Sequence, residues 1–223
     1  MDNWNGTVSL LLACIELILL INLAVFADKN RLNRIAMWMV TLLMVYQALE
    51  FFMCGLESDN NSTAFLAFLD ITFLPPLNLL LVLVLSGSYN KKFNLVFIPS
   101  LFFIIYYASV VEEFTVSDCT VLYASYNYPL GDLYGFFYYL PLIISIILLI
   151  LFIKKNRDKK ERSIALLLLS GNIFISLPVI AGFILNAAGY PALLDIIESI
   201  MCKFAVVYAV LLSVVCLQNS VKK

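Results

Sequence analysis

Residues 134–153 read YGFFYYLPLIISIILLILFI and are followed at once by KKNRDKKER at residues 154–162. A helix rises about 1.5 Å per residue, so about 20 apolar residues cross the hydrocarbon core of a bilayer, which is about 30 Å thick. The first stretch has that length and no charged side chain, whereas the second is mostly Lys and Arg. An apolar span that ends at a basic loop is typical of an integral membrane protein.

Six further stretches of the 223-residue chain meet the same criterion. The composition agrees, because 63% of the residues are hydrophobic, 13% are charged and the mean hydropathy is +0.97. We therefore expect an all-α, seven-transmembrane-helix bundle that forms a single domain over residues 1–223, as a multi-pass protein of the cell (inner) membrane. The expected spans are Val8–Phe26, Ile35–Gly55, Phe65–Leu85, Phe93–Val110, Tyr134–Ile153, Ser163–Ala187 and Ala192–Leu217.

The basic residues between these spans predict the orientation of the bundle. Of the 14 Lys and Arg residues, 13 fall on one side, and the opposite side carries only acidic charges. The positive-inside rule therefore predicts an external amino terminus and a cytoplasmic carboxyl terminus. In this arrangement residues 154–162 form a basic cytoplasmic loop, and residues 112–132 form an extracytoplasmic loop.

Several classes of function are disfavoured by what the sequence lacks. It contains no histidine, so His-ligated haem, His-based zinc sites and Ser-His-Asp catalysis are excluded. A net charge of −1 suggests no nucleic-acid partner. We predict no catalytic residues, no metal site and no cofactor. An integral-membrane enzyme ranks third among the candidate functions, because no activated nucleophile is visible.

Ionisable residues within the apolar spans are the main functional signal, since each is costly at that depth unless it is paired, hydrated or neutral. Gln47 and Glu50 share one face of the second span, and Lys203 follows Ser199 by one turn in the seventh. We expect a polar chamber that opens outward between the second, third and seventh spans. Its predicted ligand-binding residues are Gln47, Glu50, Asp70, Asp195, Glu198, Ser199 and Lys203.

A lysine in the seventh span and an acid in the third also raise the alternative of a retinal-binding protein. In that case Lys203 would form the Schiff base, and Asp70 would be its counterion. No arginine precedes Asp70, and Ser199 stands where a carboxylate would precede the lysine. A buried ion pair is therefore the favoured interpretation of Lys203.

Two cysteines are expected on the external side: Cys54 near the end of the second span, and Cys119 in the outer loop. We predict a disulfide between them, because both lie on the oxidising side, and closing a loop of this length contributes roughly 4 kcal/mol in the chain-entropy model. The tyrosines of this loop can form a hairpin lid, although an interfacial aromatic belt is the favoured interpretation.

Two families resemble the chain at these positions. Phe73–Leu77, Gly131–Tyr139 and Leu177-Pro178 resemble the seven-helix amino-terminal sensor region of bacterial histidine kinases. Tyr46–Glu50 and Ser199–Ala205 are similar to an uncharacterised prokaryotic family of stand-alone seven-helix membrane proteins. The resemblance implies a sensor in which a separate cytoplasmic protein reads the signal.

We therefore expect a stand-alone, receptor-like membrane protein that binds a small polar or amphipathic ligand in the outward-facing chamber. Its partners are the lipid bilayer, the small-molecule ligand and a cytoplasmic signalling protein. The alternative is a small-molecule or proton-coupled transporter that uses the same acids as a relay. It ranks second because the first three spans are not repeated in the last three.

Overall fold

The computed structural model of the protein describes residues 5–55, 61–189 and 197–220, without the side chains of residues 183, 186, 187 and 198. The chain is mostly helical. Its α-helices are α1 (Thr7–Phe26), α2 (Arg31–Gly55), α3 (Asn61–Thr72), α4 (Leu74–Leu85), α5 (Ile98–Ser109), α6 (Gly131–Lys155), α7 (Lys159–Ala187) and α8 (Ile197–Ser220). Two 3₁₀ helices, η1 (Lys91–Phe97) and η2 (Val111–Glu113), and the strands β1 (Thr115–Cys119) and β2 (Ala124–Asn127) complete the described elements.

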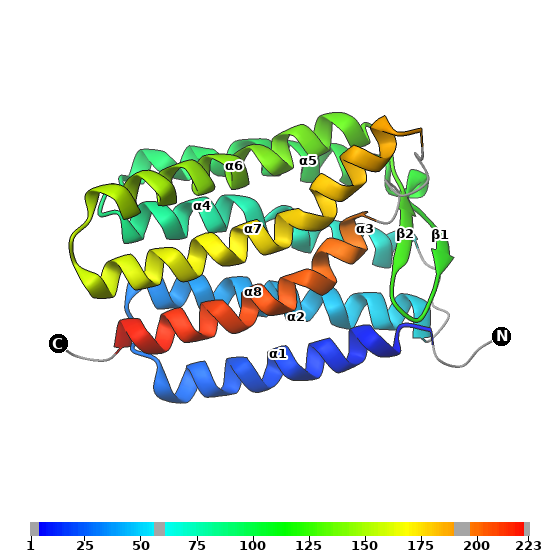
Figure 1. Cartoon of the computed structure of the whole chain (residues 1–223). Helices are drawn as coiled ribbons and strands as arrows, with labels where there is room; N and C mark the ends of the chain where they lie inside the picture. Colours follow the sequence, from blue (N-terminus) through cyan, green and yellow to red (C-terminus); the bar gives the residue numbers. More distant parts are fainter. Residues whose placement is uncertain (1–4, 56–60, 190–196, 221–223) are drawn as a thin grey trace.

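Seven helical segments in the described residues are long and apolar enough to cross a membrane, in agreement with the expected number. The third consists of α3 followed by α4, and the fourth of η1 followed by α5. The expected start of the seventh span, Ala192, lies outside the described residues. Figure 1 shows the segments side by side along one axis, with the basic 154–162 segment joining α6 and α7 at the end away from the hairpin.

The third span is interrupted at Phe73, two residues before the Pro75-Pro76 pair. Because Pro76 has no N–H, it cannot donate a hydrogen bond to the carbonyl of Thr72 four residues earlier. The Ser100 hydroxyl of α5 donates to that carbonyl instead, at 3.1 Å. In membrane helices such side chains compensate for the bond that proline removes.

Helix α2 lies at the centre of the bundle and packs against α1, α3, α4 and α8. Helix α1 lies at its edge, with Ser9, Ala13, Glu16 and Leu23 buried. Leu11, Ile18 and Val25 of α1 point outward and are about 60% exposed or more (60%, 59% and 67%). One polar face turned inward and one apolar face turned outward is the pattern expected of a helix that contacts lipid.

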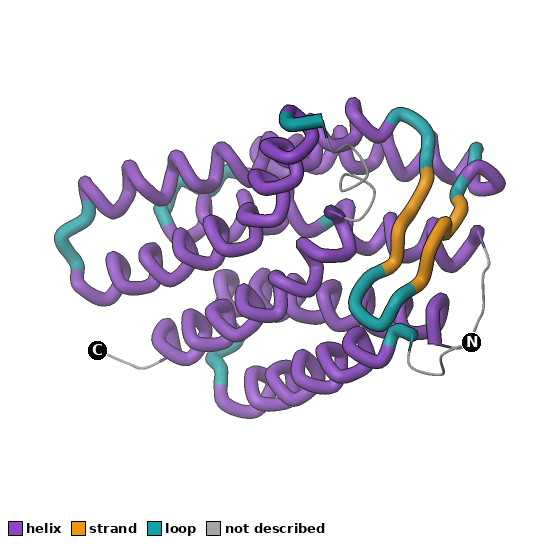
Figure 2. Tube along the Cα trace, turned by 45° about the vertical axis from the view of Figure 1, so that its right-hand side comes forward, coloured by secondary structure: helices purple, strands orange, loops and turns teal. Residues whose placement is uncertain are grey.

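The two strands form an antiparallel hairpin across the end of the bundle near the start of α1 (Figure 2). Thr115 pairs with Asn127 and Cys119 pairs with Ala124. The hairpin is bonded to the helices below it, since the Gly6 N–H at the start of α1 donates to the Thr120 carbonyl at 3.1 Å. The 112–132 loop therefore contains a hairpin that is bonded to the helical bundle.

Candidate functional site

The candidate site forms where α1, α2 and α8 meet beneath the hairpin, in the half of each helix that lies nearer to it. Gln47 and Glu50 are one turn apart on α2, and both are buried. Ser199 and Cys202 are buried on the facing side of α8, and Lys203 follows them with a side chain that is 12% exposed. Spacings of three and four residues bring each of these sets to one helix face, so the two faces meet.

Lys203 and Glu50 form an ion pair, with 2.6 Å between Nζ of the lysine and Oε1 of the glutamate. The ammonium also donates to Oγ of Ser9 at 2.7 Å and to Oε1 of Gln47 at 2.8 Å. An ammonium has three N–H groups, so these three acceptors satisfy it completely. The charge is thus neutralised and fully hydrogen-bonded inside an apolar bundle, which is the condition under which a buried charge is tolerated.

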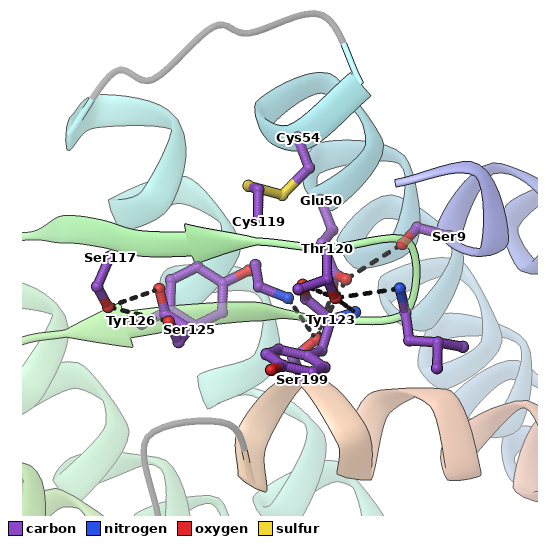
Figure 3. Close-up of a disulfide and its surroundings, with 12 residues drawn as sticks. Ser9, Glu50, Cys54, Ser117, Cys119, Thr120, Tyr123, Ser125, Tyr126 and Ser199 are labelled. Carbon is purple, nitrogen blue, oxygen red and sulfur yellow. Dashed lines mark hydrogen bonds between the residues drawn. A yellow bond between two sulfur atoms is a disulfide. The ribbon is translucent and has the colours of Figure 1, made fainter. Parts of the chain in front are cut away.

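The Glu50 carboxylate is equally well satisfied. It accepts hydrogen bonds from the Ser9 hydroxyl at 3.1 Å and from the Ser199 hydroxyl at 3.1 and 3.2 Å, in addition to the lysine. Figure 3 shows Glu50 reaching down between Ser9 of α1 and Ser199 of α8. We refer to these five residues together as the latch: Ser9, Gln47, Glu50, Ser199 and Lys203.

The latch is connected directly to the hairpin. The backbone N–H of Ala124, the first residue of β2, donates to the Ser199 hydroxyl at 3.2 Å. Two residues on, the Tyr126 hydroxyl lies 3.2 Å from the hydroxyl of Tyr46 on α2. The hairpin thereby contacts both helices that carry the ion pair.

A disulfide joins Cys119, the last residue of β1, to Cys54 near the end of α2, with their Cα atoms 5.4 Å apart (Figure 3). This is the pair predicted from the sequence. Because Cys54 is one turn beyond Glu50 on the same helix, the covalent bond holds the hairpin above the latch.

The structure differs from the expected open chamber in how these side chains are used. Gln47, Glu50, Ser199 and Lys203 come together, but their polar atoms bond to one another and are not left to line a cavity. Asp195 lies outside the described residues, and so does the side chain of Glu198. The ion-pair partner of Lys203 is Glu50, whereas a Schiff base with a counterion on the third span would pair with Asp70.

Two buried carboxyl groups lie beside the latch. Glu16 of α1 is fully buried, and neither of its carboxyl oxygens has a hydrogen-bond partner among the described residues. Asp70 of α3 is also buried, and its Oδ2 atom likewise has no hydrogen-bond partner within the described part of the chain. Glu16 lies near enough to Lys203 and Asp70 for electrostatic interaction. Buried polar atoms of this kind are rare and often belong to functional sites.

Ser9 is the latch residue that was not predicted from the sequence, because placing a single serine in an apolar span costs little free energy. The signal was its spacing from Ala13 and Glu16, which places all three on one helix face.

Two further polar clusters that the sequence did not reveal lie along α8. In the first, Asn78 of α4 donates to Asn172 of α7 at 2.7 Å and accepts from the Tyr208 hydroxyl of α8. In the second, near the basic end, Asn33 of α2 accepts a hydrogen bond from Asn219 of α8 at 2.9 Å. The hydrogen-bond partners of such uncharged residues can be identified only once the packing of the helices is known.

Comparison with protein-family models, with characterised proteins and with solved structures gives no match for this chain. The geometry of the latch and its surroundings is therefore the basis for a functional assignment.

Replacing Lys203 by Met should destabilise the protein by roughly 3–5 kcal/mol, because it leaves the Glu50 carboxylate buried without its counterion. Thermal unfolding in detergent or nanodiscs would measure the loss. The double variant Lys203→Met with Glu50→Gln should recover part of it, since the stranded charge is then gone. Lys92→Met, at the exposed start of η1, is the matched control. Equal stability of Lys203→Met and Lys92→Met would contradict the ion pair.

Proposed function

We propose that this protein is a seven-helix receptor of the cell (inner) membrane with an external amino terminus and a cytoplasmic carboxyl terminus. Seven apolar helical segments support insertion into a membrane. The concentration of Lys and Arg residues in the links at the end opposite the hairpin supports the orientation. The hairpin then lies on the external side, where its disulfide is chemically stable.

Labelling of introduced cysteines tests this orientation. Leu122→Cys, in the exposed turn of the hairpin, should react with a membrane-impermeant maleimide in intact cells, and Arg157→Cys should react only after the membrane is opened. The unsubstituted protein supplies the background from its own free cysteines. Labelling of Arg157→Cys in intact cells would contradict the orientation.

The receptor function is supported above all by one observation, which is that the external hairpin is hydrogen-bonded to an ion pair inside the bundle. The Ala124 N–H, the Ser199 hydroxyl and the Glu50 carboxylate form a continuous chain of hydrogen bonds. A stimulus that moves β2 therefore changes the bonding of the ion pair between Lys203 and Glu50. A small displacement is amplified when an element has two discrete bonded arrangements.

Helix α8 offers a route from the latch to the cytoplasmic end. Below Ser199 and Lys203 it carries Tyr208, which bonds to α4, and then Asn219, which bonds to α2. It also packs along α7, which begins within the basic 154–162 segment. We propose that release of the latch shifts α8 and α7 together, and that a cytoplasmic signalling protein reads the shift at this basic segment.

Spin-label distances test the coupling between the two ends. Labels at Lys91, the first residue of η1, and at Arg157, between α6 and α7, are introduced as unnatural amino acids and report the end of the bundle opposite the hairpin. Ser199→Ala, which removes the hydroxyl that joins Ala124 to Glu50, should shift or broaden the distance distribution by several ångströms. Ser170→Ala, on an exposed face of α7, should leave it unchanged. Identical distributions in the two variants would contradict a receptor that signals through the latch.

A proton-coupled transporter is the second candidate, and the buried carboxyl groups of Glu16 and Asp70 favour it, since such groups in membrane proteins often carry protons. Proteoliposomes with an entrapped pH dye separate the two functions. The receptor should produce no proton flux above that of empty liposomes. A flux that Glu16→Gln abolishes would replace the receptor by a transporter.

A further inference from the structure

The structure contains a large cleft that no described residue of α1 or α2 lines. It has a volume of about 840 Å³ and is bounded by α6, α7, the first turn of α8 and strand β2. Ligand pockets in proteins typically measure about 300–1,000 Å³, so this cleft is large enough for an organic ligand. Neither Glu50 nor Lys203 lines it.

The chemistry of the cleft changes along its length. At the hairpin end it is lined by Tyr126, Tyr128 and Asp132, and Tyr139 follows about two turns after Asp132 on α6. Further along α6 and α7 the lining is aliphatic, with Leu142, Ile143, Ile146 and Ile180 among its members. Asp132 and Ile146 are separated by about 21 Å of helix rise, which suits a long alkyl chain.

The lining contains one charged residue, Asp132, and no Lys or Arg among the described residues. Tyrosine faces attract cations, and quaternary ammonium groups are held by aromatic rings in just this way. A carboxylate beside several rings therefore favours a cationic head group and disfavours an anionic one.

The wall of the cleft is open where a side chain would otherwise fill it. Gly135 lines the cleft one turn after Asp132, and a Cβ atom placed on it would meet only the ring of Tyr139, at 3.8 Å. The absence of a side chain here keeps space beside the tyrosine.

We propose that the cleft binds a single-chain amphiphile with an ammonium head group, whose head lies between Asp132 and the tyrosines and whose chain lies along α6 and α7. This deepens the proposed receptor function and rests on it for its consequence. Two residues that line the cleft lie close to latch residues. Tyr126 contacts Tyr46, the residue before Gln47 on α2, and Ile197 is two residues before Ser199 on α8. A ligand in the cleft would therefore contact β2 and α8, the two elements that the hydrogen bond from Ala124 to Ser199 joins.

Equilibrium binding of radiolabelled tetradecyltrimethylammonium, below its micellar concentration, to the protein in nanodiscs tests the proposal, with empty nanodiscs as background. Asp132→Asn should weaken binding about fivefold, the upper range for an exposed charge pair. Asp118→Asn, an exposed acid of the hairpin outside the cleft, is the matched control and should have no effect. Gly135→Leu should weaken binding at least tenfold because its side chain occupies the cleft.

Tetradecanol, which has the same alkyl chain and no charge, should also bind. Gly135→Leu should weaken its binding, whereas Asp132→Asn should leave its binding unchanged. The proposal is overturned if Asp132→Asn binds the cation as tightly as the Asp118→Asn control, or if tetradecyl sulfate binds as well as the cation. Binding without any change in the Lys91–Arg157 distance would retain the site and contradict the receptor. A distance change in Ser199→Ala, together with a failure of the unsubstituted protein to bind the cation, would support the receptor and contradict the cleft as a binding site.

Discussion

The ion pair between Lys203 and Glu50 is the interaction on which the rest of the structure depends. Removing two charges from water costs several kcal/mol for each ion, and the mutual attraction offsets this only when every remaining hydrogen bond is made. Here the requirement is met by side chains from three helices, with Ser9, Gln47 and Ser199 completing the bonds. The charges therefore specify how α1, α2 and α8 pack, because a shifted register would leave one of them unsatisfied.

The seven helical segments could be predicted from the sequence because length and apolarity are local properties of the chain. The inward direction of Gln47 and Glu50 followed in the same way from their spacing on one helix. The partners of those residues could not be predicted, since they depend on which helices meet. The backbone N–H of Ala124 carries no signal in the sequence, and the signal for Ser9 is only its spacing from Glu16, although both take part in the bonding of the latch.

The proposed ligand site and the proposed coupling element occupy neighbouring but different parts of the molecule. The sequence suggested one outward chamber lined by the ionisable residues, whereas the structure uses Lys203 and Glu50 to hold helices together and places a large, mostly apolar cleft behind β2. A site whose polar atoms already have hydrogen-bond partners has little left to offer a ligand, and a fully satisfied network of this kind makes the packing around it rigid. Strand β2 and the first turn of α8 belong to both regions, so they are the elements through which a ligand would act.

Amide hydrogen exchange at Ala124 tests most directly whether the buried ion pair holds the hairpin in place. Its N–H is the donor that links β2 to Ser199. In Lys203→Met, exchange at Ala124 should accelerate at least tenfold relative to the unsubstituted protein, while the amide of Leu149, buried in α6, keeps its protection. Unchanged exchange at Ala124 in a folded Lys203→Met variant would contradict the account, because the hairpin would then be held independently of the charges beneath it.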